Sequence, residues 1–201
     1  QCADVALAQV KGKGKSALSF FDSAMNAGRA AFFEAQAKVR NAIEKQAFSL
    51  HYQPRIACDN GVVVGCEALL RMPADLADST SVNLLIENAE EQALGEVLGD
   101  WVLEEACAQM ARWRADQVAV PVVGVNVSAS QINPSFVQKV ADLLRRHGLS
   151  PGALEIEMRE EHVLSNLTTA RSVIGSLRSI GVGVVLDDFG RGYSSLSLLR
   201  E

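Results

Sequence analysis

The sequence predicts an α/β fold built from parallel βαβ units, and three observations support this class. Short apolar runs alternate with amphipathic helical stretches through the second half of the chain, a pattern typical of strands that are covered on both faces. Two of these helical stretches end at a glycine, Gly148 and Gly181, as helices commonly do. An apolar fraction of 48% allows the 201 residues to bury a substantial core.

The first elements precede this alternation. Residues 3–22 read as a short helix, a basic Gly-Lys turn and a small strand. Residues 28–46 place four apolar side chains on one helical stripe, which predicts a connecting helix. From Phe48 onward, an alternating segment at 48–56, a turn at 58–61 and a second apolar run at 62–71 predict a β-hairpin.

The remaining elements follow in regular order. A long helical region comes first, in two halves, and strands and helices then alternate to the end of the chain. The expected helices span 82–94, 95–116, 135–148 and 168–181, and the expected strands span 120–128, 153–158 and 183–190.

Charge and cysteine content exclude several classes of protein. The net charge of −5 argues against a broad surface for a nucleic-acid polymer and against a polybasic membrane patch. No apolar run approaches the roughly 18 residues of a membrane span, so we expect a cytoplasmic segment without membrane contact. Any anchor of a parent protein is expected outside this segment, because the chain begins with Gln1 and reads as a piece of a longer one.

The four cysteines have no CxxC spacing and are expected to be reduced, structural thiols.

Acid or amide side chains stand at the carboxyl end of each strand from 62–71 onward. In a βα barrel this edge is where functional groups gather, although a single acid there is often a helix cap or a solvated turn residue. Carboxylate and amide oxygens favour Mg²⁺ or Mn²⁺ over zinc, and two such ions suit the hydrolysis of a phosphodiester. The residues are Glu67, Asn126, Glu155, Glu157, Glu160, Asp187 and Asp188.

Four motifs in order resemble those of the EAL domain, a family of metal-dependent phosphodiesterases that linearise cyclic di-GMP. They are "CEALLR" after a "YQP" hairpin, then "VNVS", "EIEMREE" and "LDDFGRGYSSLSLL". The resemblance implies a (β/α)8 TIM-like barrel with an antiparallel first strand over residues 48–201, incomplete at its C-terminus. It also implies a remnant of a GGDEF-like domain, a short α+β piece, at residues 1–27, a connecting helix at 28–47, and a homodimer formed through the EAL domain.

The resemblance also assigns roles to single residues. It implies two ions, Mg²⁺ or Mn²⁺, the first held by Glu67, Asn126, Glu157 and Asp187 and the second by Asp187 and Asp188. It gives catalytic roles to Glu67, Asp187, Asp188 and Glu160, the last as the anchor of the "DFGRGYSSL" loop. It implies that Gln53, Leu69 and Arg71 contact cyclic di-GMP. Read without the resemblance, these three are a strand-edge amide, a core residue and a solvated surface charge.

Three positions depart from the family pattern. Arg159 stands where Thr or Ser is usual, Arg191 replaces a Thr in the loop after Asp188, and Met72 replaces a Trp. An arginine beside the carboxylates could pair with Glu157 or Glu160 and compete with a metal. The alternative function is therefore a degenerate EAL module that binds cyclic di-GMP, or a partner protein, without turnover. The strands that supply a further lysine and glutamate in the family are expected beyond Glu201, so this chain by itself is expected to be inactive.

Overall fold

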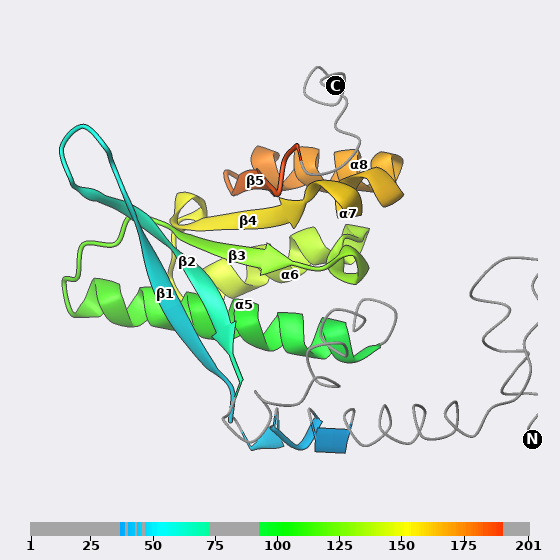
Figure 1. Ribbon diagram of the computed structural model, residues 1–201, viewed down its shortest axis with the longest axis horizontal. Helices are drawn as coiled ribbons and strands as arrows, with labels where there is room; N and C mark the ends of the chain where they lie inside the picture. The colour runs from blue at the N-terminus through cyan, green and yellow to red at the C-terminus, as the bar shows by residue number, and fades with distance from the viewer. Residues whose placement is uncertain (1–36, 39, 43, 46, 73–92, 191–201) are drawn as a thin grey trace, which may run out of the picture.

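A computed structural model describes residues 37–38, 40–42, 44–45, 47–72 and 93–190 of the chain. They form one five-stranded sheet with the order β1-β2-β3-β4-β5 (Figure 1). β1 runs antiparallel to β2, and the other neighbouring strands are parallel. Within the described residues the sheet stays open, with β1 and β5 at its edges, as expected for an incomplete barrel with an antiparallel first strand. The strands are β1 Ser49–Ile56, β2 Val63–Arg71, β3 Val123–Val127, β4 Leu154–Arg159 and β5 Gly183–Asp187.

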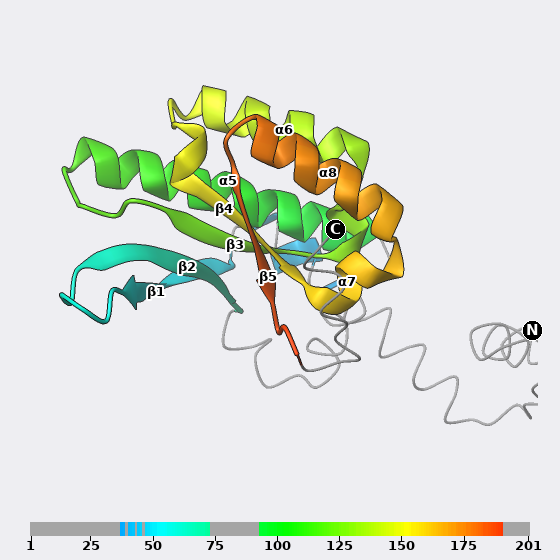
Figure 2. The same ribbon diagram turned by 90° about the horizontal axis from the view of Figure 1, so that it is seen from above.

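Three long helices lie on the same side of the sheet (Figure 2). They are α5 Ala93–Ala115, α6 Pro134–Arg146 and α8 Leu167–Ser179. Shorter pieces complete the connections: 3₁₀ turns at Ala129–Gln131 and Pro151–Ala153, and the six-residue helix α7 Glu160–Ser165, which follows β4 directly. None of the helices described here is long and apolar enough to cross a membrane.

The core lies between the sheet and these helices. On β4, Leu154, Ile156 and Met158 are fully buried in it, while the intervening residues project from the opposite face of the strand. The helix-facing side of the sheet is therefore apolar, and the polar side chains gather on the other side, which is the inner side of the expected barrel.

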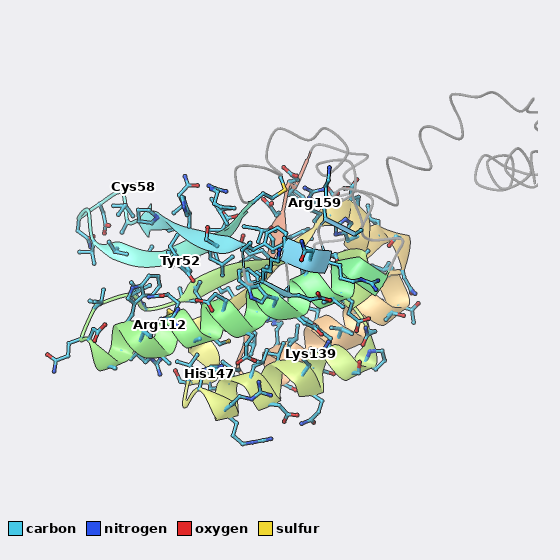
Figure 3. All side chains as sticks on the ribbon, turned by 90° about the horizontal axis from the view of Figure 1, so that it is seen from below. Tyr52, Cys58, Arg112, Lys139, His147 and Arg159 are labelled. Atoms are coloured by element: carbon cyan, nitrogen blue, oxygen red, sulfur yellow. The ribbon has the colours of Figure 1, made fainter. Side chains whose placement is uncertain are left out.

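Burial also fixes the state of two thiols. Cys66 of β2 and Cys107 of α5 are buried in this core, whereas Cys58 is exposed in the β1–β2 turn (Figure 3). Burial raises the pKa of Cys66 to about 11 and that of Cys107 to about 12. Both thiols therefore stay protonated near neutral pH and behave as structural side chains.

Local signals mark the start of α6 and the ends of α6 and α8, the latter at the two expected glycines. Asn133 caps α6 by accepting a hydrogen bond from the Ser135 backbone N–H at 3.1 Å, and Pro134 occupies the first helical position. Gly148 and Gly181 follow α6 and α8 with φ of 63° and 90°, conformations that favour glycine.

Other boundaries differ from the sequence prediction. The strand expected at 120–128 is shorter, Val123–Val127, and α7 was not predicted at all. The described residues from 37 to 44 are helical, within the expected connecting helix. The expected elements in residues 1–36, and the helix at 82–94 up to residue 92, lie outside the described residues.

Candidate functional site

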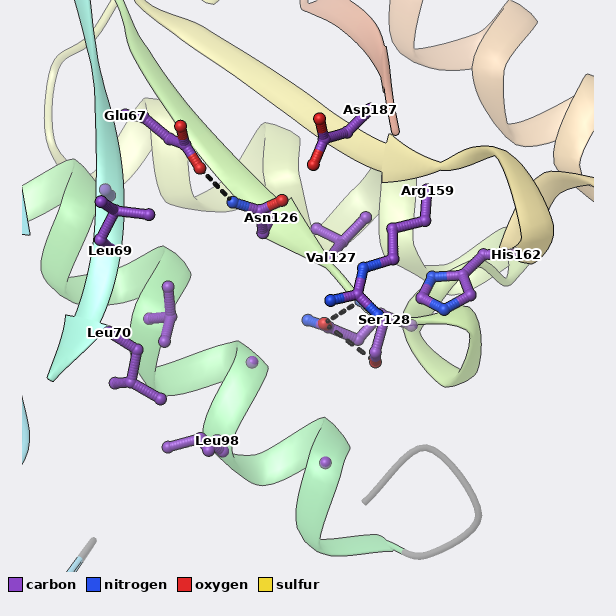
Figure 4. A pocket seen from close by; sticks show the side chains of 15 residues that line it. Glu67, Leu69, Leu70, Leu98, Asn126, Val127, Ser128, Arg159, His162 and Asp187 are labelled. Carbon is purple, nitrogen blue, oxygen red and sulfur yellow. Dashed lines mark hydrogen bonds between the residues drawn. The ribbon is translucent and has the colours of Figure 1, made fainter. Parts of the chain in front are cut away.

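Side chains from three parallel strands meet at the carboxyl end of the sheet (Figure 4). Glu67 projects from β2, Asn126 from β3, and Asp187 from the last position of β5. The Asn126 side-chain amide donates a hydrogen bond to Glu67 Oε1 at 2.7 Å. Because the amide nitrogen points to Glu67, the amide oxygen of Asn126 lies on the side of Asp187 (Figure 4).

These groups line a pocket of about 420 Å³. The sequence-predicted residues in its wall are Glu67, Leu69, Asn126 and Asp187. Apolar side chains of β2 and α5 form a second wall, and Arg159 and His162 a third. The remaining predicted site residues do not line this pocket; these are Gln53, Arg71, Glu157, Glu160 and Asp188.

Arg71 and Gln53 both lie on the hairpin. Gln53 is exposed on β1 and is paired with Glu67 in the strand register. The Arg71 guanidinium donates to the backbone carbonyl of Leu70 at 3.0 Å, so a phosphate contact requires the side chain to turn away from its own strand.

Glu157 is the most strongly perturbed acid in this region. It is buried on β4, with 6% of its surface exposed. Burial and the charges of Glu67, Asp187 and Glu155 together raise its pKa to about 7, and the Arg55 guanidinium opposes them. The negative charge on the inner face of the sheet thus exceeds the positive charge that the described side chains place beside Glu157.

The donor set fits a hard divalent cation. No three His, Cys, Asp or Glu side chains in the described part of the chain stand close enough together to hold a metal ion. The Glu67 and Asp187 carboxylates and the Asn126 amide oxygen, which meet in the pocket wall, are nevertheless all oxygen donors. The Glu157 carboxylate stands close enough to Glu67 and Asp187 to be affected by their charge, and the His162 imidazole borders the same pocket from α7. Oxygen donors with excess negative charge are the environment that Mg²⁺ and Mn²⁺ prefer.

The turn after β5 is held from α7. Gly190 donates its backbone N–H to Glu160 Oε2 at 3.1 Å, and Glu160 is buried at the start of α7. Asp188 adopts φ of 53°, an uncommon conformation for a residue with a side chain, and its N–H donates to Asp187 Oδ1 at 2.8 Å. Glu160 therefore lies where the resemblance implies a loop anchor. The rest of that loop, from Arg191, and the residues that follow it to 201 lie outside the described residues.

Arginines near the acids pair differently from the sequence expectation. Arg159 lies 3.6 Å from Glu161, an exposed partner, rather than pairing with Glu157 or Glu160. The arginine that does contact Glu157 is Arg55 of β1, which sequence reasoning missed. Alternation along β1 could have placed Arg55 on the inner face, but its partners stand 100 and 102 residues away in the chain.

The three histidines do not gather at the site. His147 bonds Glu104 on the outer helices at 2.7 Å (Figure 3), and His51 is exposed on β1. His162 is buried, with 8% exposed, and borders the pocket from α7.

A (β/α) sheet with acid and amide side chains toward the carboxyl ends of its parallel strands defines the class of (β/α)-barrel domains, whose functional groups gather at that edge. Within that class, the EAL domain family model matches residues 36–201. The chain belongs to the EAL domain family. It is 35% identical over 200 residues to the bifunctional diguanylate cyclase/cyclic di-GMP phosphodiesterase MucR of Pseudomonas aeruginosa, covering 99% of this chain and 29% of MucR. The chain spans less than a third of the length of the curated relatives it matches.

Solved structures agree with this family. The MucR phosphodiesterase in complex with c-di-GMP matches with a TM-score of 0.75 and 35% identity, over 83% of this chain and 68% of that one. The EAL enzyme Bd1971 in its cAMP- and cyclic-di-GMP-bound form matches with a TM-score of 0.76 and 27% identity, over 87% and 49% of the two chains. The five described strands therefore belong to an EAL-type barrel.

Proposed function

We propose that this domain hydrolyses cyclic di-GMP to the linear dinucleotide pGpG with two divalent cations, Mg²⁺ or Mn²⁺. The observation that carries the proposal is the meeting of Glu67, Asn126 and Asp187, from three strands, in the wall of one pocket. Membership of the EAL family and the likeness to a protein named as a cyclic di-GMP phosphodiesterase support the choice of substrate.

The proposal divides the predicted ligands between the two cations. Glu67, Asn126, Glu157 and Asp187 would hold one cation, and Asp187 with Asp188 the second. Cations bound there would supply an activated water and would neutralise charge on the phosphodiester. Asn126 orients Glu67 through its 2.7 Å hydrogen bond, and Glu160 fixes the turn that carries Asp188 through Gly190.

The same proposal assigns the dinucleotide contacts. Leu69 offers apolar surface in the pocket wall. Gln53 and Arg71 contact the nucleotide from the hairpin, with Arg71 leaving the Leu70 carbonyl to clamp a phosphate oxygen. The homodimer through this domain also belongs to the proposal and is checked by sedimentation of the full-length protein.

A second candidate is a module that binds cyclic di-GMP or a partner protein without turnover. Arg159 favours it, because a half-exposed cation (52%) borders the same pocket as Glu67 and Asp187. A guanidinium there can neutralise a phosphate without supplying a nucleophile. We expect no turnover from this chain by itself, and the sheet that stays open at β1 and β5 among the described residues supports this expectation.

Product analysis with the full-length protein separates the two candidates. Cyclic di-GMP is incubated with Mn²⁺ or Mg²⁺, with a chelator as one control and the Glu67→Gln variant as another. The proposal expects pGpG in the metal-containing reaction of the wild type alone. Nucleotide binding in the presence of Mn²⁺ with no pGpG formed would instead establish the non-hydrolysing module.

A further inference from the structure

We propose that Arg55 is a positioning residue that holds the Glu157 carboxylate on the inner face of the sheet, in place for the cation site. The inference rests on the proposed function, since it concerns how one of the proposed cation ligands is oriented. It adds a residue on β1, which carries none of the proposed cation ligands.

Arg55 reaches two acids of β4 with separate nitrogens. Its Nη2 donates to Glu155 Oε2 at 2.5 Å, and its Nη1 lies 3.5 Å from Glu157 Oε1. The short bond to Glu155 fixes the guanidinium, and the second nitrogen then restrains one oxygen of Glu157. No other hydrogen bond reaches the Glu157 carboxylate from the described residues, so its second oxygen remains available for a ligand role.

Three glycines on three other strands make room for this arrangement. A Cβ on Gly124 of β3 would stand 1.9 Å from Glu157 Oε1, so any side chain there would displace the carboxylate. A Cβ on Gly183 of β5 would stand 2.6 Å from the Glu155 Cγ, and one on Gly65 of β2 would stand 3.0 Å from Arg55 Nη2. The inner face is thus hollowed where the three charged side chains of Arg55, Glu155 and Glu157 lie.

Charge supports the same role. Glu157 stands among Glu67, Glu155 and Asp187, and their mutual repulsion favours turning its carboxylate toward solvent. The other arginines described near this face are engaged elsewhere, Arg71 with the Leu70 carbonyl and Arg159 with Glu161. Arg55 therefore supplies the positive charge that keeps the Glu157 carboxylate in its position over Gly124. Removing a residue that hydrogen-bonds a metal ligand typically lowers the metal affinity by about 10- to 100-fold.

The test measures Mn²⁺ affinity of the full-length protein by calorimetric titration. Arg55→Met removes the charge and keeps the length of the side chain, Arg55→Gln keeps a shorter donor, and Arg55→Lys keeps the charge. Arg112→Met is the matched control, because Arg112 also makes a 2.5 Å ion pair with a glutamate, Glu105, but on the surface of α5. Circular dichroism and thermal melts verify that each variant is folded.

We expect Arg55→Met and Arg55→Gln to bind Mn²⁺ at least about tenfold more weakly than the wild type. Arg55→Lys keeps the charge on a single nitrogen and should recover part of the loss, and Arg112→Met should bind as the wild type does. Wild-type affinity in a folded Arg55→Met or Arg55→Gln variant would overturn the inference. So would the failure of both variants to fold, because Arg55 would then maintain the fold rather than position a ligand. A wild type that binds no Mn²⁺ would instead overturn the proposed function.

Discussion

Glu157 is the residue at which the requirements of folding and of the site conflict. A carboxylate with 6% exposure beside Glu67, Asp187 and Glu155 is unfavourable when ionised. The chain tolerates it because Gly124 leaves space for the side chain and Arg55 supplies an opposing charge. This is the kind of cost that proteins accept at functional sites and offset elsewhere.

The raised pKa of Glu157 predicts how pH affects the metal-free protein. The pKa lies at about 7 in the folded state against an ordinary 4.5, so proton binding favours the folded state between these values. This stabilisation is complete below pH 4.5 and is lost as pH rises through 7. Glu157→Gln should therefore unfold with less dependence on pH in the presence of a chelator. It should also be more stable than the wild type at pH 8, by about 1 kcal/mol.

Urea denaturation at pH 5 and pH 8 measures this difference. Glu161→Gln is the control, because Glu161 is 72% exposed and lies only two residues beyond the end of the same strand, β4. Equal pH dependence of the wild type and Glu157→Gln would contradict the account of this residue.

At the scale of elements, asparagine caps mark the starts of α6 and α8. The start of α6 combines an Asn133 cap with Pro134, and the start of α8 uses Asn166, whose side chain accepts from the Thr169 N–H at 3.2 Å. α6 follows β3, which carries Asn126, and α8 precedes β5, which carries Asp187. The Asn133 cap therefore fixes the chain shortly after Asn126, a proposed cation ligand, whereas the C-terminal end of α8 leads into the strand that carries Asp187.

Replacing the α6 cap gives a prediction at this scale. Asn133→Ala removes the oxygen that accepts from both the N–H and the hydroxyl of Ser135, and it should lower the free energy of unfolding by about 1 kcal/mol. Asn133→Ser retains a capping oxygen and should stay within about 0.5 kcal/mol of the wild type. The comparison is made by urea denaturation, and equal destabilisation by both substitutions would rule out the capping explanation.

For the molecule as a whole, elements with strong local signals were predictable from sequence. The glycines after α6 and α8 and the alternation of β1 carry such signals, and the structure confirms the elements they mark. The helix α7 was missed because its six residues continue a strand without a turn or breaker between them. The acids at the strand ends were found because parallel strands bring their carboxyl ends to one edge.

Contacts between distant parts of the chain were not predictable in this way. Arg55 and its partners on β4 are separated by 100 residues or more, and only the register of four strands brings them together. The sequence also could not show which glutamate pairs with Arg159, because Glu157, Glu160 and Glu161 are all near it in the chain. In the folded protein the partner is Glu161. The roles given to Glu67, Asn126, Glu157, Asp187 and Asp188 remain predictions.

The central claim is that acids from separate strands act together as one cation site. Its most direct test is Mn²⁺ titration of the full-length protein and of Asp187→Asn, with Asp142→Asn as the control because Asp142 pairs with Arg145 on the surface of α6. The account predicts that Asp187→Asn binds Mn²⁺ at least about tenfold more weakly, while Asp142→Asn matches the wild type. Unchanged Mn²⁺ affinity in a folded Asp187→Asn variant would contradict it.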